Sequence, residues 1–397
     1  MGQSTVANSL TAEDVQRRLR PSRAGRSVDQ KELLDRLIRE RFSYGITRIG
    51  CVTRLDRVGV PVIQVVRPEA LSNAVVQGKG LTLEQAAASA LMECLETWAG
   101  EQPPGAVEIA SAENIGAEIA QLYSNATVAD CPGDWSKQPI GWLFGWDLVQ
   151  KRAVPVPRAL VDTIYTEPSP HLRFFARTTA GLGAGWSMKQ AVLQGILEIL
   201  ERHAVAAAKR LPRFFDNYQV DPGRVAGPRA MPVLERLDAA GLAVGAWLVP
   251  AAHGLPIYWC QVMENNPPVE ILALPAEGYG CDFTHDGALA KALTEACQGR
   301  VTAISGARED LIRDLYLQRV DRKELAIWQA SLTCPPRYLE PASPHSNCLA
   351  IVAGAVEAAR HAGAEAVIVV PLLADDDAHR YVVRVVAPCL AAGRFER

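Results

Sequence analysis

The chain has 397 residues, of which 49% are hydrophobic and 21% charged, and its formal net charge is −3. This composition is typical of a globular protein with an ample core, and the charge balance gives no indication of nucleic-acid binding. No apolar run could span a bilayer, no signal peptide is recognisable, and the nine cysteines form no Cys-x-x-Cys motif. We therefore expect a cytoplasmic protein that binds neither membrane nor nucleic acid.

The first half of the chain begins with a polar, arginine-rich stretch that predicts a flexible arm over residues 1–28. The elements expected after it are a helix over 32–41, strands over 45–53 and 58–66, a long helix that begins at Thr82 and is stopped by Gly100 and Pro103, a variable helical stretch over 105–130, and a hairpin over 141–149 and 153–161 that turns at Gln150 and Lys151.

The second half continues the alternation of helices and strands. The expected elements are a unit with a second long helix over 172–212, a helix over 229–242, strands over 243–249 and 256–262, a third unit over 276–310, a segment rich in proline and histidine over 334–345, a helix over 350–362, and strands over 366–370 and 381–386. This alternation fits an α/β or α+β fold in which sheets back the long helices. The Asp375–Asp377 run between two strands fits a solvated turn better than a metal site.

Three long segments are variants of one helix. They are Gln85-Ala-Ala-Ala-Ser-Ala-Leu-Met-Glu-Cys-Leu-Glu96, Gln190-Ala-Val-Leu-Gln-Gly-Ile-Leu-Glu-Ile-Leu-Glu201 and Gly287-Ala-Leu-Ala-Lys-Ala-Leu-Thr-Glu-Ala-Cys-Gln298. Their central glutamates, Glu93, Glu198 and Glu295, are separated by 105 and 97 residues, so the repeat is widely spaced. A glycine stands four residues before a hydroxyl residue ahead of each copy, and in two copies the hydroxyl is followed three residues later by glutamine. That spacing is typical of a helix-capping box.

Each copy carries one narrow polar row. In the first copy, positions 85, 89, 93 and 96 advance by four, four and three residues and therefore share a face. The corresponding rows are Gln190, Gln194, Glu198 and Glu201 in the second copy, and Gly287, Lys291, Glu295 and Gln298 in the third. Because most other positions are apolar, we expect these helices to be embedded in a core with the polar row facing a cleft.

Two of the rows bring carboxylates together. Glu93 and Glu96, like Glu198 and Glu201, are spaced by three residues. Two charges about 6 Å apart repel by roughly 3 kcal/mol at an effective dielectric constant near 20. Carboxylates that converge in a cleft therefore need cations or protons, and Mg²⁺ shared with phosphate oxygens suits such ligands. The alternative interpretation is that each glutamate is simply solvated at the edge of its helix.

The motifs around these helices resemble those of the YcaO family. The resemblance rests on Gln77-Gly-Lys-Gly80 leading to Ser89-x-x-x-Glu93-x-x-Glu96, on Gly181-Leu-Gly-Ala-Gly185 leading to Glu198-x-x-Glu201-Arg202, and on Ala292–Arg300 followed by Ser305-Gly-Ala-Arg308-Glu-Asp310. It covers roughly residues 40–390. It implies an α+β fold of largely antiparallel sheets that back three acidic helices around a nucleotide cleft, with ATP and Mg²⁺ bound without a P-loop; neither GxGxxG nor GxxxxGK[ST] occurs.

The resemblance also implies site residues. The Mg²⁺ ligands would be Glu93, Glu96, Glu198 and Glu201, and the nucleotide contacts would be Ser89, Gln194, Arg202, Gln298 and Arg300, with Lys79 and Glu295 close by. Glu198, Glu201, Arg202 and Arg300 are the catalytic candidates among them. Alternatively, Arg202 is only the i,i+4 partner of Glu198, and Lys79 is a solvated turn residue.

Three departures from the family pattern affect the outer part of this site. Ala180 stands where Asn is usual, His203 where an acidic residue is common, and Gly299 where Ser is frequent. They leave room for altered nucleotide affinity or for a silent site.

Members of the family activate a backbone amide, whose oxygen is transferred to the ATP γ-phosphate. A Cys, Ser or Thr nucleophile gives an azoline, and external sulfide gives a thioamide. The chain ends without the Pro-x-Pro-x-Pro tail typical of azoline-forming members, and about 40 residues precede the expected fold.

These features, with Gly45-Ile-Thr-Arg48 and Leu55-Asp-Arg-Val-Gly-Val-Pro61, resemble the subgroup that works with a TfuA-type partner. We therefore expect an arm and first helix over 1–40 and a catalytic domain over 41–397, with pseudo-repeats near 45–105, 140–212 and 243–310. The expected function is thioamide formation on a ribosomal peptide or protein, with a TfuA-like partner, a sulfur donor and a possible homodimer. The alternatives are an azoline-forming cyclodehydratase and a non-catalytic scaffold.

Overall fold

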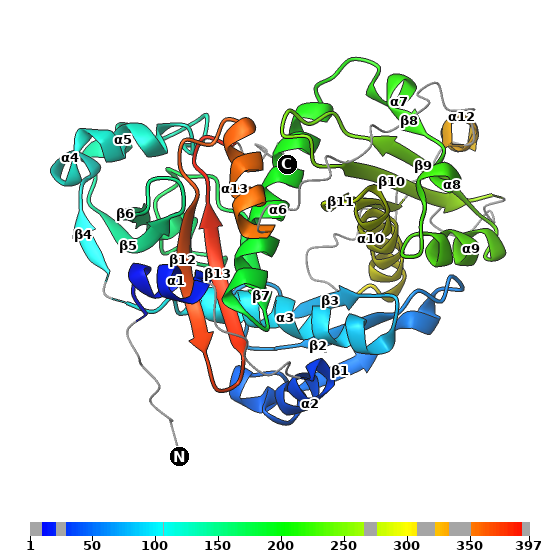
Figure 1. Cartoon of the computed structure of the whole chain (residues 1–397), viewed down its shortest axis with the longest axis horizontal. Helices are drawn as coiled ribbons and strands as arrows, with labels where there is room; N and C mark the ends of the chain where they lie inside the picture. The colour runs from blue at the N-terminus through cyan, green and yellow to red at the C-terminus, as the bar shows by residue number, and fades with distance from the viewer. Residues whose placement is uncertain are drawn as a thin grey trace. The chain divides into compact units, whose positions relative to one another are not determined.

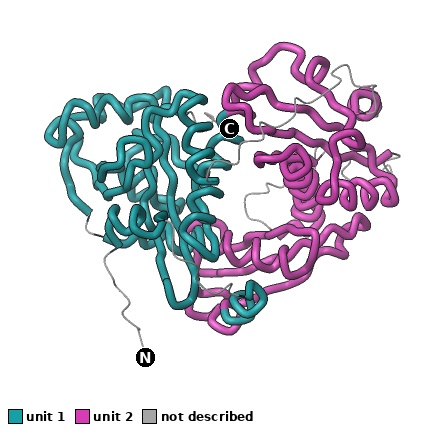
Figure 2. Tube along the Cα trace, viewed as in Figure 1, with its two compact units in different colours: residues 1–36, 95–203, 348–397 teal, residues 37–94, 204–347 magenta. Residues whose placement is uncertain are grey.

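The computed structural model describes residues 10–20, 29–105, 107–265, 276–307, 322–332 and 351–390. The chain forms two compact units, distinguished by colour in Figure 2. Unit 1 comprises Met1–Arg36, Leu95–His203 and Cys348–Arg397, and unit 2 comprises Leu37–Cys94 and Ala204–Asn347. Helix α3 (Leu83–Glu101) and helix α6 (Met188–Ala208) each contribute residues to both units.

Unit 1 is built on a six-stranded sheet whose pairings are all antiparallel (Figure 1). Its strands are β4 (Glu108–Ala110), β5 (Ile140–Asp147), β6 (Arg152–Pro157), β7 (Leu182–Gly185), β12 (Ile368–Asp375) and β13 (Arg380–Val386). The order is β4-β5-β12-β13-β7, and β6 pairs with β5. The predicted hairpin is confirmed: β5 and β6 pair directly, and Lys151 takes a positive φ of 55° in the turn between them.

The remaining helices of unit 1 are α1 (Ala12–Leu19), α4 (Ala112–Ile115), α5 (Ala117–Ser124) and α13 (Ile351–His361), with 3-10 turns η3 (Trp135–Lys137) and η4 (Arg158–Leu160). The predicted helix over 350–362 is α13. The Asp375–Asp377 turn is also confirmed, because Asp375 Oδ1 accepts from the backbone N–H groups of Asp377 and Ala378.

Helix α1 corrects the prediction of a flexible arm at residues 12–19; residues 1–9 and 21–28 of that arm lie outside the described part. Thr11 and Asp14 form a capping box at its start, and Ala12 and Val15 are buried. Arg18 donates two hydrogen bonds to Asp376, 358 residues away, at 3.0 and 2.9 Å. Arg17 and Arg18, two of the arginines that suggested a solvated arm, therefore belong to a short amphipathic helix.

Acid is expected to loosen helix α1. The hydrogen bond from Arg18 holds the pKa of Asp376 below its ordinary value of 3.8. The ion pair therefore contributes stability above that ordinary value and loses it as pH falls through the lower, folded-state pKa. Because the Asp376 side chain is 61% exposed, the contribution should stay below about 1 kcal/mol. Hydrogen exchange of residues 12–19 in the wild type and in Asp376→Asn should show faster exchange in the variant at neutral pH; equal exchange would contradict the contact.

Unit 2 contains two antiparallel sheets. The three-stranded sheet has the order β1-β2-β3, and the four-stranded sheet has the order β11-β10-β9-β8. Their strands are β1 (Arg48–Cys51), β2 (Val62–Val66), β3 (Val75–Lys79), β8 (Gln219–Val220), β9 (Leu242–Leu248), β10 (Ile257–Glu264) and β11 (Ala276–Cys281). The helices outside α3 and α6 are α2 (Gln30–Arg39, which begins in unit 1), α7 (Phe214–Asn217), α8 (Pro222–Val225), α9 (Met231–Ala239), α10 (His285–Ser305) and α12 (Arg322–Leu332), with 3-10 turns η1 (Arg41–Tyr44) and η2 (Thr53–Leu55). Helix α10 packs on β10 and β11, and both α9 and α12 pack on β9.

The repeated unit of the sequence is a strand, a turn and a long helix that packs back on the strand. One glycine of each strand, Gly78, Gly183 or Gly280, lies against the helix that follows. A Cβ atom on these glycines would stand 1.9, 2.1 and 2.2 Å from helix backbone atoms. Since no side chain could move aside to relieve such a contact, the glycine permits the close packing of helix and strand.

The starts of these helices agree with the predicted capping. The backbone N–H groups of Gln85 and Gln190 donate to the hydroxyls of Thr82 and Ser187, both at 3.2 Å, and Thr284 caps α10 in the same way. The predicted α+β class with largely antiparallel sheets behind three pseudo-repeated helices is therefore confirmed.

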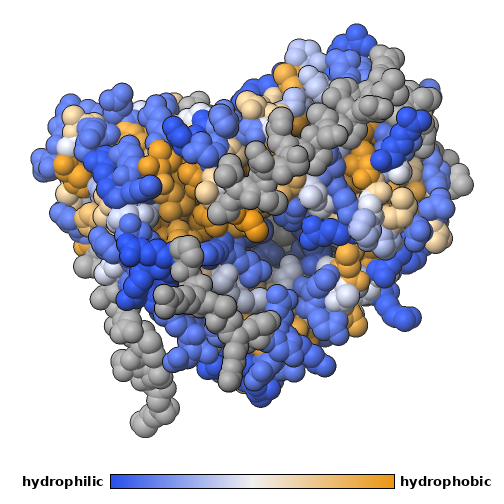
Figure 3. All heavy atoms as spheres, viewed as in Figure 1, coloured by the Kyte–Doolittle hydropathy of each residue, from blue (hydrophilic) through white to orange (hydrophobic). Residues whose placement is uncertain are grey.

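Some sequence features fall outside the described residues, namely the segment 334–345 and the Arg308–Asp310 part of the third motif. Within the described part, no helix has the length and apolarity required to cross a membrane. On the face shown in Figure 3, hydrophilic side chains predominate and hydrophobic ones gather in local patches.

Candidate functional site

Most members of the polar rows of the three long helices are partly exposed, whereas most positions between them are buried. On α3, Glu93 and Glu96 are partly exposed beside buried Leu91, Cys94 and Leu95. The other predicted site residues on these helices behave alike: Ser89, Glu198, Glu201, Arg202, Glu295, Gln298 and Arg300 are partly exposed, and Gln194 is exposed. The predicted pattern of an embedded helix with one accessible polar row is therefore present in all three copies.

In unit 2, strand β3 connects the first repeat to the third helix. Its side chains alternate, so that Gly78 faces α3 while Gln77 and Lys79 face α10. Lys79 Nζ lies 2.7 Å from Glu295 Oε2, and the side-chain amide of Gln298 donates to the backbone oxygen of Gln77 at 2.6 Å. The structure thus brings together Lys79 and Glu295, which the sequence placed close to each other. Lys79 is an ion-paired strand residue and not a solvated turn residue.

Arg300 lies in a buried ion cluster of unit 2. It donates from Nε and Nη2 to Asp56 at 2.9 and 3.2 Å, and from Nη2 to Glu264 at 2.8 Å. Glu264 also pairs with Arg57. Burial alone would lower the pKa of Arg300, but the hydrogen bonds and charges of Asp56 and Glu264 outweigh it and raise the pKa. The guanidinium is therefore fixed as a cation, on the face of α10 turned away from Glu295 and Gln298, because two residues advance about 200° around a helix.

In unit 1, the second row is anchored where β7 begins. The backbone N–H of Gly181 donates to Glu198 Oε2 at 3.3 Å, and Arg202 Nη2 lies 3.8 Å from Glu198 Oε1. Gly181 has a positive φ of 87°, and a Cβ atom there would stand 2.2 Å from the backbone oxygen of Val385. Only glycine fits this position without strain, and its backbone N–H can therefore donate to the Glu198 carboxylate. The i,i+4 pairing of Arg202 with Glu198 is present.

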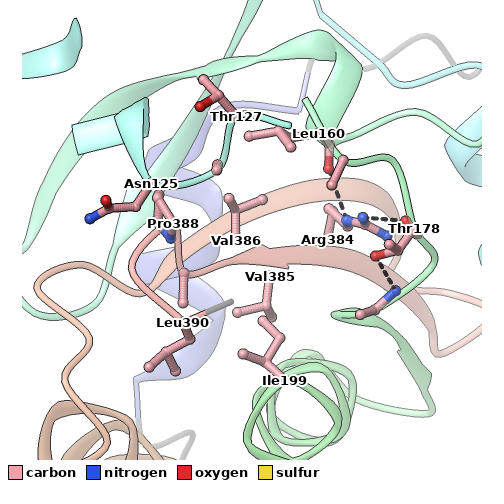
Figure 4. Close-up of a pocket in the computed structure, with 14 residues that line it drawn as sticks. Asn125, Thr127, Leu160, Thr178, Ile199, Arg384, Val385, Val386, Pro388 and Leu390 are labelled. Atoms are coloured by element: carbon pink, nitrogen blue, oxygen red, sulfur yellow. Dashed lines mark hydrogen bonds between the residues drawn. The ribbon is translucent and has the colours of Figure 1, made fainter. Parts of the chain in front are cut away.

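A small cavity adjoins this part of α6 (Figure 4). Its volume is about 80 Å³, and Thr178, Ala180, Ile199 and Arg384 are among its lining residues. Ala180 and Ile199 each neighbour a member of the Gly181–Glu198 contact in sequence. Arg384 is buried and donates to the backbone oxygens of Leu160 and Thr178 at 3.0 and 2.6 Å. Burial lowers the pKa of Arg384, while the neighbouring charge of Glu198 acts in the opposite direction.

A second anchor of unit 1 is the fully buried carboxylate of Asp162. It lies 2.6 Å from His171 Nε2 and 2.6 Å from Arg177 Nη2, with Arg158 Nε at 3.4 Å. The next residue, Thr163, donates from its hydroxyl to the backbone oxygen of Thr97 at 2.7 Å. Since Thr97 follows Glu96 on α3, this bond fixes the loop after η4 to the end of the first polar row.

Sequence reasoning missed four charged residues of these clusters: Asp56, Glu264, Asp162 and Arg384. Asp56 belongs to the Leu55–Pro61 segment, which was singled out as a subgroup feature without a role. The partners in these clusters are far apart in the chain: Arg300 and Asp56 by 244 residues, and Arg384 and Leu160 by 224. A single sequence gives no information about such pairings.

The glutamates of the polar rows suit a Mg²⁺ ion that is shared with substrate phosphates better than a metal ion held by protein ligands alone. No group of three or more His, Cys, Asp or Glu side chains that could hold a metal occurs within the described ranges. Mg²⁺ keeps several waters and is commonly bound through one or two carboxylates together with substrate phosphates. Partly exposed glutamates on rigid helices, Glu93 and Glu96 or Glu198 and Glu201, provide that kind of ligand.

A family model described as YcaO cyclodehydratase, ATP- and Mg²⁺-binding, matches residues 77–391. Its description agrees with the predicted cofactors, ATP and Mg²⁺. Among curated proteins, one encoded in the tfuA 3′ region of Rhizobium leguminosarum bv. trifolii is 32% identical over 70% of this chain and 67% of its own length. A protein of Mycobacterium tuberculosis is 33% identical over 68% of this chain, and the match spans 60% of that protein.

Solved structures show the same fold. YcaO from Methanopyrus kandleri, bound with AMPPCP and Mg²⁺, has a TM-score of 0.67 and 23% identity, and 92% of each chain is covered. A heterocyclase in complex with substrate and cofactor has a TM-score of 0.70 and 19% identity, covering 95% of this chain and 55% of the heterocyclase. At these identities the similarity establishes the fold.

Proposed function

The chain belongs to the YcaO family and resembles its TfuA-associated members, and on that premise we propose that it uses ATP and Mg²⁺ to activate a backbone amide of a peptide or protein. The observation that carries the proposal is the accessible polar row on each of three embedded helices, with a glutamate on all three, Arg202 beside the row of α6 and Lys291 on the row of α10. Carboxylates suit Mg²⁺, and guanidinium groups suit phosphate oxygens.

The residues have distinct roles in this proposal. Mg²⁺ would be held by Glu93, Glu96, Glu198 and Glu201, and it would neutralise phosphate charge when bound. The nucleotide would contact Ser89, Gln194, Arg202, Gln298 and Arg300. Lys79 is paired with Glu295 at 2.7 Å, so it supports the row of α10 and can also approach a phosphate. The Gly181 N–H orients Glu198.

The proposed reaction replaces the amide oxygen with the nucleophile and consumes one ATP. A nucleophile forms a bond to the amide carbon, and the amide oxygen takes the γ-phosphoryl group while ADP leaves. The carbon–oxygen bond then breaks and phosphate departs. We propose sulfide as the nucleophile, with a thioamide as the product, a TfuA-like protein as partner and a separate sulfur donor. Support comes from the similarity to a protein encoded in the tfuA 3′ region.

Azoline formation is the second candidate, in which a Cys, Ser or Thr side chain of the substrate is the nucleophile. It is favoured by the description of the matching family model as a cyclodehydratase and by the fold shared with a heterocyclase. The substrate would lose one water and require no sulfur donor.

Mass spectrometry of the product separates these candidates. The protein is incubated with ATP, Mg²⁺, sulfide, a TfuA-like protein and a candidate peptide. We expect a mass gain equal to the difference between a sulfur and an oxygen atom, and only when sulfide is supplied. Loss of one water without sulfide would instead support azoline formation. Absence of Mg²⁺-dependent ATP binding in calorimetry would contradict both and favour a non-catalytic scaffold.

A further inference from the structure

The polar row of α10 differs in charge from the polar row of α3. On α3 the row contains Glu93 and Glu96 and has neither lysine nor arginine. On α10 it contains one lysine, Lys291, and one glutamate, Glu295, four residues apart. Lys291 is therefore the cationic member of its row, and the proposed function gives it no role.

The ammonium group of Lys291 is held in place but remains accessible. Its side chain is 37% exposed, and Nζ lies 3.0 Å from Asp282 Oδ2. Nζ also donates to the backbone oxygen of Cys281 at 2.9 Å. An ammonium group has three N–H donors, and within the described residues Asp282 and Cys281 take two of them. One donor is therefore left for a ligand that approaches from the solvent side.

The ion pairs along the row of α10 contain more cations than carboxylates. Arg229 Nη1 lies 3.8 Å from Asp282 Oδ2, the carboxylate oxygen that also pairs with Lys291. About one turn after Lys291, Glu295 pairs with Lys79 at 2.7 Å. Three cationic side chains thus share two carboxylates, and all five belong to unit 2. The row of α10 is therefore suited to an anion, whereas the acidic row of α3 is suited to a cation.

We propose that Lys291 is a phosphate-binding residue of the nucleotide site. The inference rests on the proposed function, in which ATP and Mg²⁺ are bound by the polar rows. Mg²⁺ offsets the glutamates, and a lysine binds phosphate as a compact point charge. A phosphate oxygen would accept the remaining N–H of Lys291 and share the cation with Asp282.

The test measures the binding of AMPPCP, a non-hydrolysable ATP analogue, with Mg²⁺ by calorimetry at several salt concentrations. Lys291→Gln removes the charge and should raise Kd by about tenfold or more, because a hydrogen bond to a charged group typically contributes that much. The Kd of this variant should also depend less steeply on salt, since one screened charge pair is lost. Lys291→Arg keeps the charge and should restore most of the affinity.

The matched control is Lys323→Gln, which removes one exposed lysine from helix α12 of the same unit. Its Kd for AMPPCP should equal that of the wild type. A structural role of Lys291 would instead lower the unfolding temperature of Lys291→Gln and leave the salt dependence of binding unchanged. That result, or failure of Lys291→Gln to fold, would overturn the inference.

Binding of AMPPCP to the wild type separates the two ways in which the inference can fail. If the wild type shows Mg²⁺-dependent binding and folded Lys291→Gln binds equally tightly, the phosphate contact of Lys291 is wrong and the proposed function stands. If the wild type shows no Mg²⁺-dependent binding, the proposed function is wrong and the role of Lys291 falls with it.

Discussion

Glu198→Gln is expected to abolish ATP turnover while leaving the protein folded. The carboxylate is partly exposed on α6, receives the N–H of Gly181 at 3.3 Å and lies 3.8 Å from Arg202. An amide of the same shape retains an oxygen that can accept the Gly181 hydrogen bond, but it carries no charge for Mg²⁺. Metal-assisted charge stabilisation contributes several kcal/mol to such transition states, so the loss should exceed about a hundredfold.

Phosphate release in the presence of ATP, Mg²⁺ and substrate measures this effect, with thermal unfolding recorded in parallel. Glu235→Gln on the exposed side of α9 is the matched control, since it also removes one helical carboxylate. Its turnover should equal that of the wild type. Unchanged turnover in folded Glu198→Gln would show that the metal ligands are assigned to the wrong row.

The features that the sequence predicted best are those set by local periodicity. Spacing alone placed Glu93, Glu198 and Glu295 on accessible rows. A helix that is apolar on its other faces buries those faces, so its polar row is the part that stays accessible. The caps at Thr82 and Ser187 were also predictable, since a hydroxyl and a glutamine three residues later complete each other's hydrogen bonds. The structure has the accessible rows and the hydroxyl half of each box, while the glutamine side chains accept from the backbone N–H of the residue before the hydroxyl, Leu81 or Trp186.

The features that escaped prediction depend on partners far away in the chain. The arginines of the first 28 residues suggested a solvated arm, yet Arg18 finds Asp376 at the turn between β12 and β13. Arg300 was predicted as a nucleotide contact, but its pairing with Asp56 and Glu264 required the fold of unit 2 to be known. Strand β3 was also missed, because its Gln-Gly-Lys end looks like a turn; its polar side chains are satisfied by α10.

Gly183→Ala is expected to disrupt the packing of α6 on β7 and to destabilise the protein severely. The added Cβ atom would stand 2.1 Å from the backbone oxygen of Ala191 and 2.8 Å from the backbone nitrogen of Gly195. Overpacked side chains usually cost about 1–3 kcal/mol because neighbours can shift. Here the obstacle is backbone, so we expect the cost to reach or exceed the upper end of that range.

Denaturant unfolding measures the change, and Gly299→Ala on α10 is its control. A Cβ atom at position 299 would meet its nearest neighbour, the backbone oxygen of Glu277, at an ordinary 3.6 Å. Alanine within a helix is favoured over glycine by up to about 1 kcal/mol, so this variant should equal or exceed the wild type in stability. If Gly183→Ala were equally stable, the close contact of strand and helix would not be what the repeated glycine provides. The glycine would then serve the turn itself, where Gly185 lies against the side chain of Gln190, and not the helix behind it.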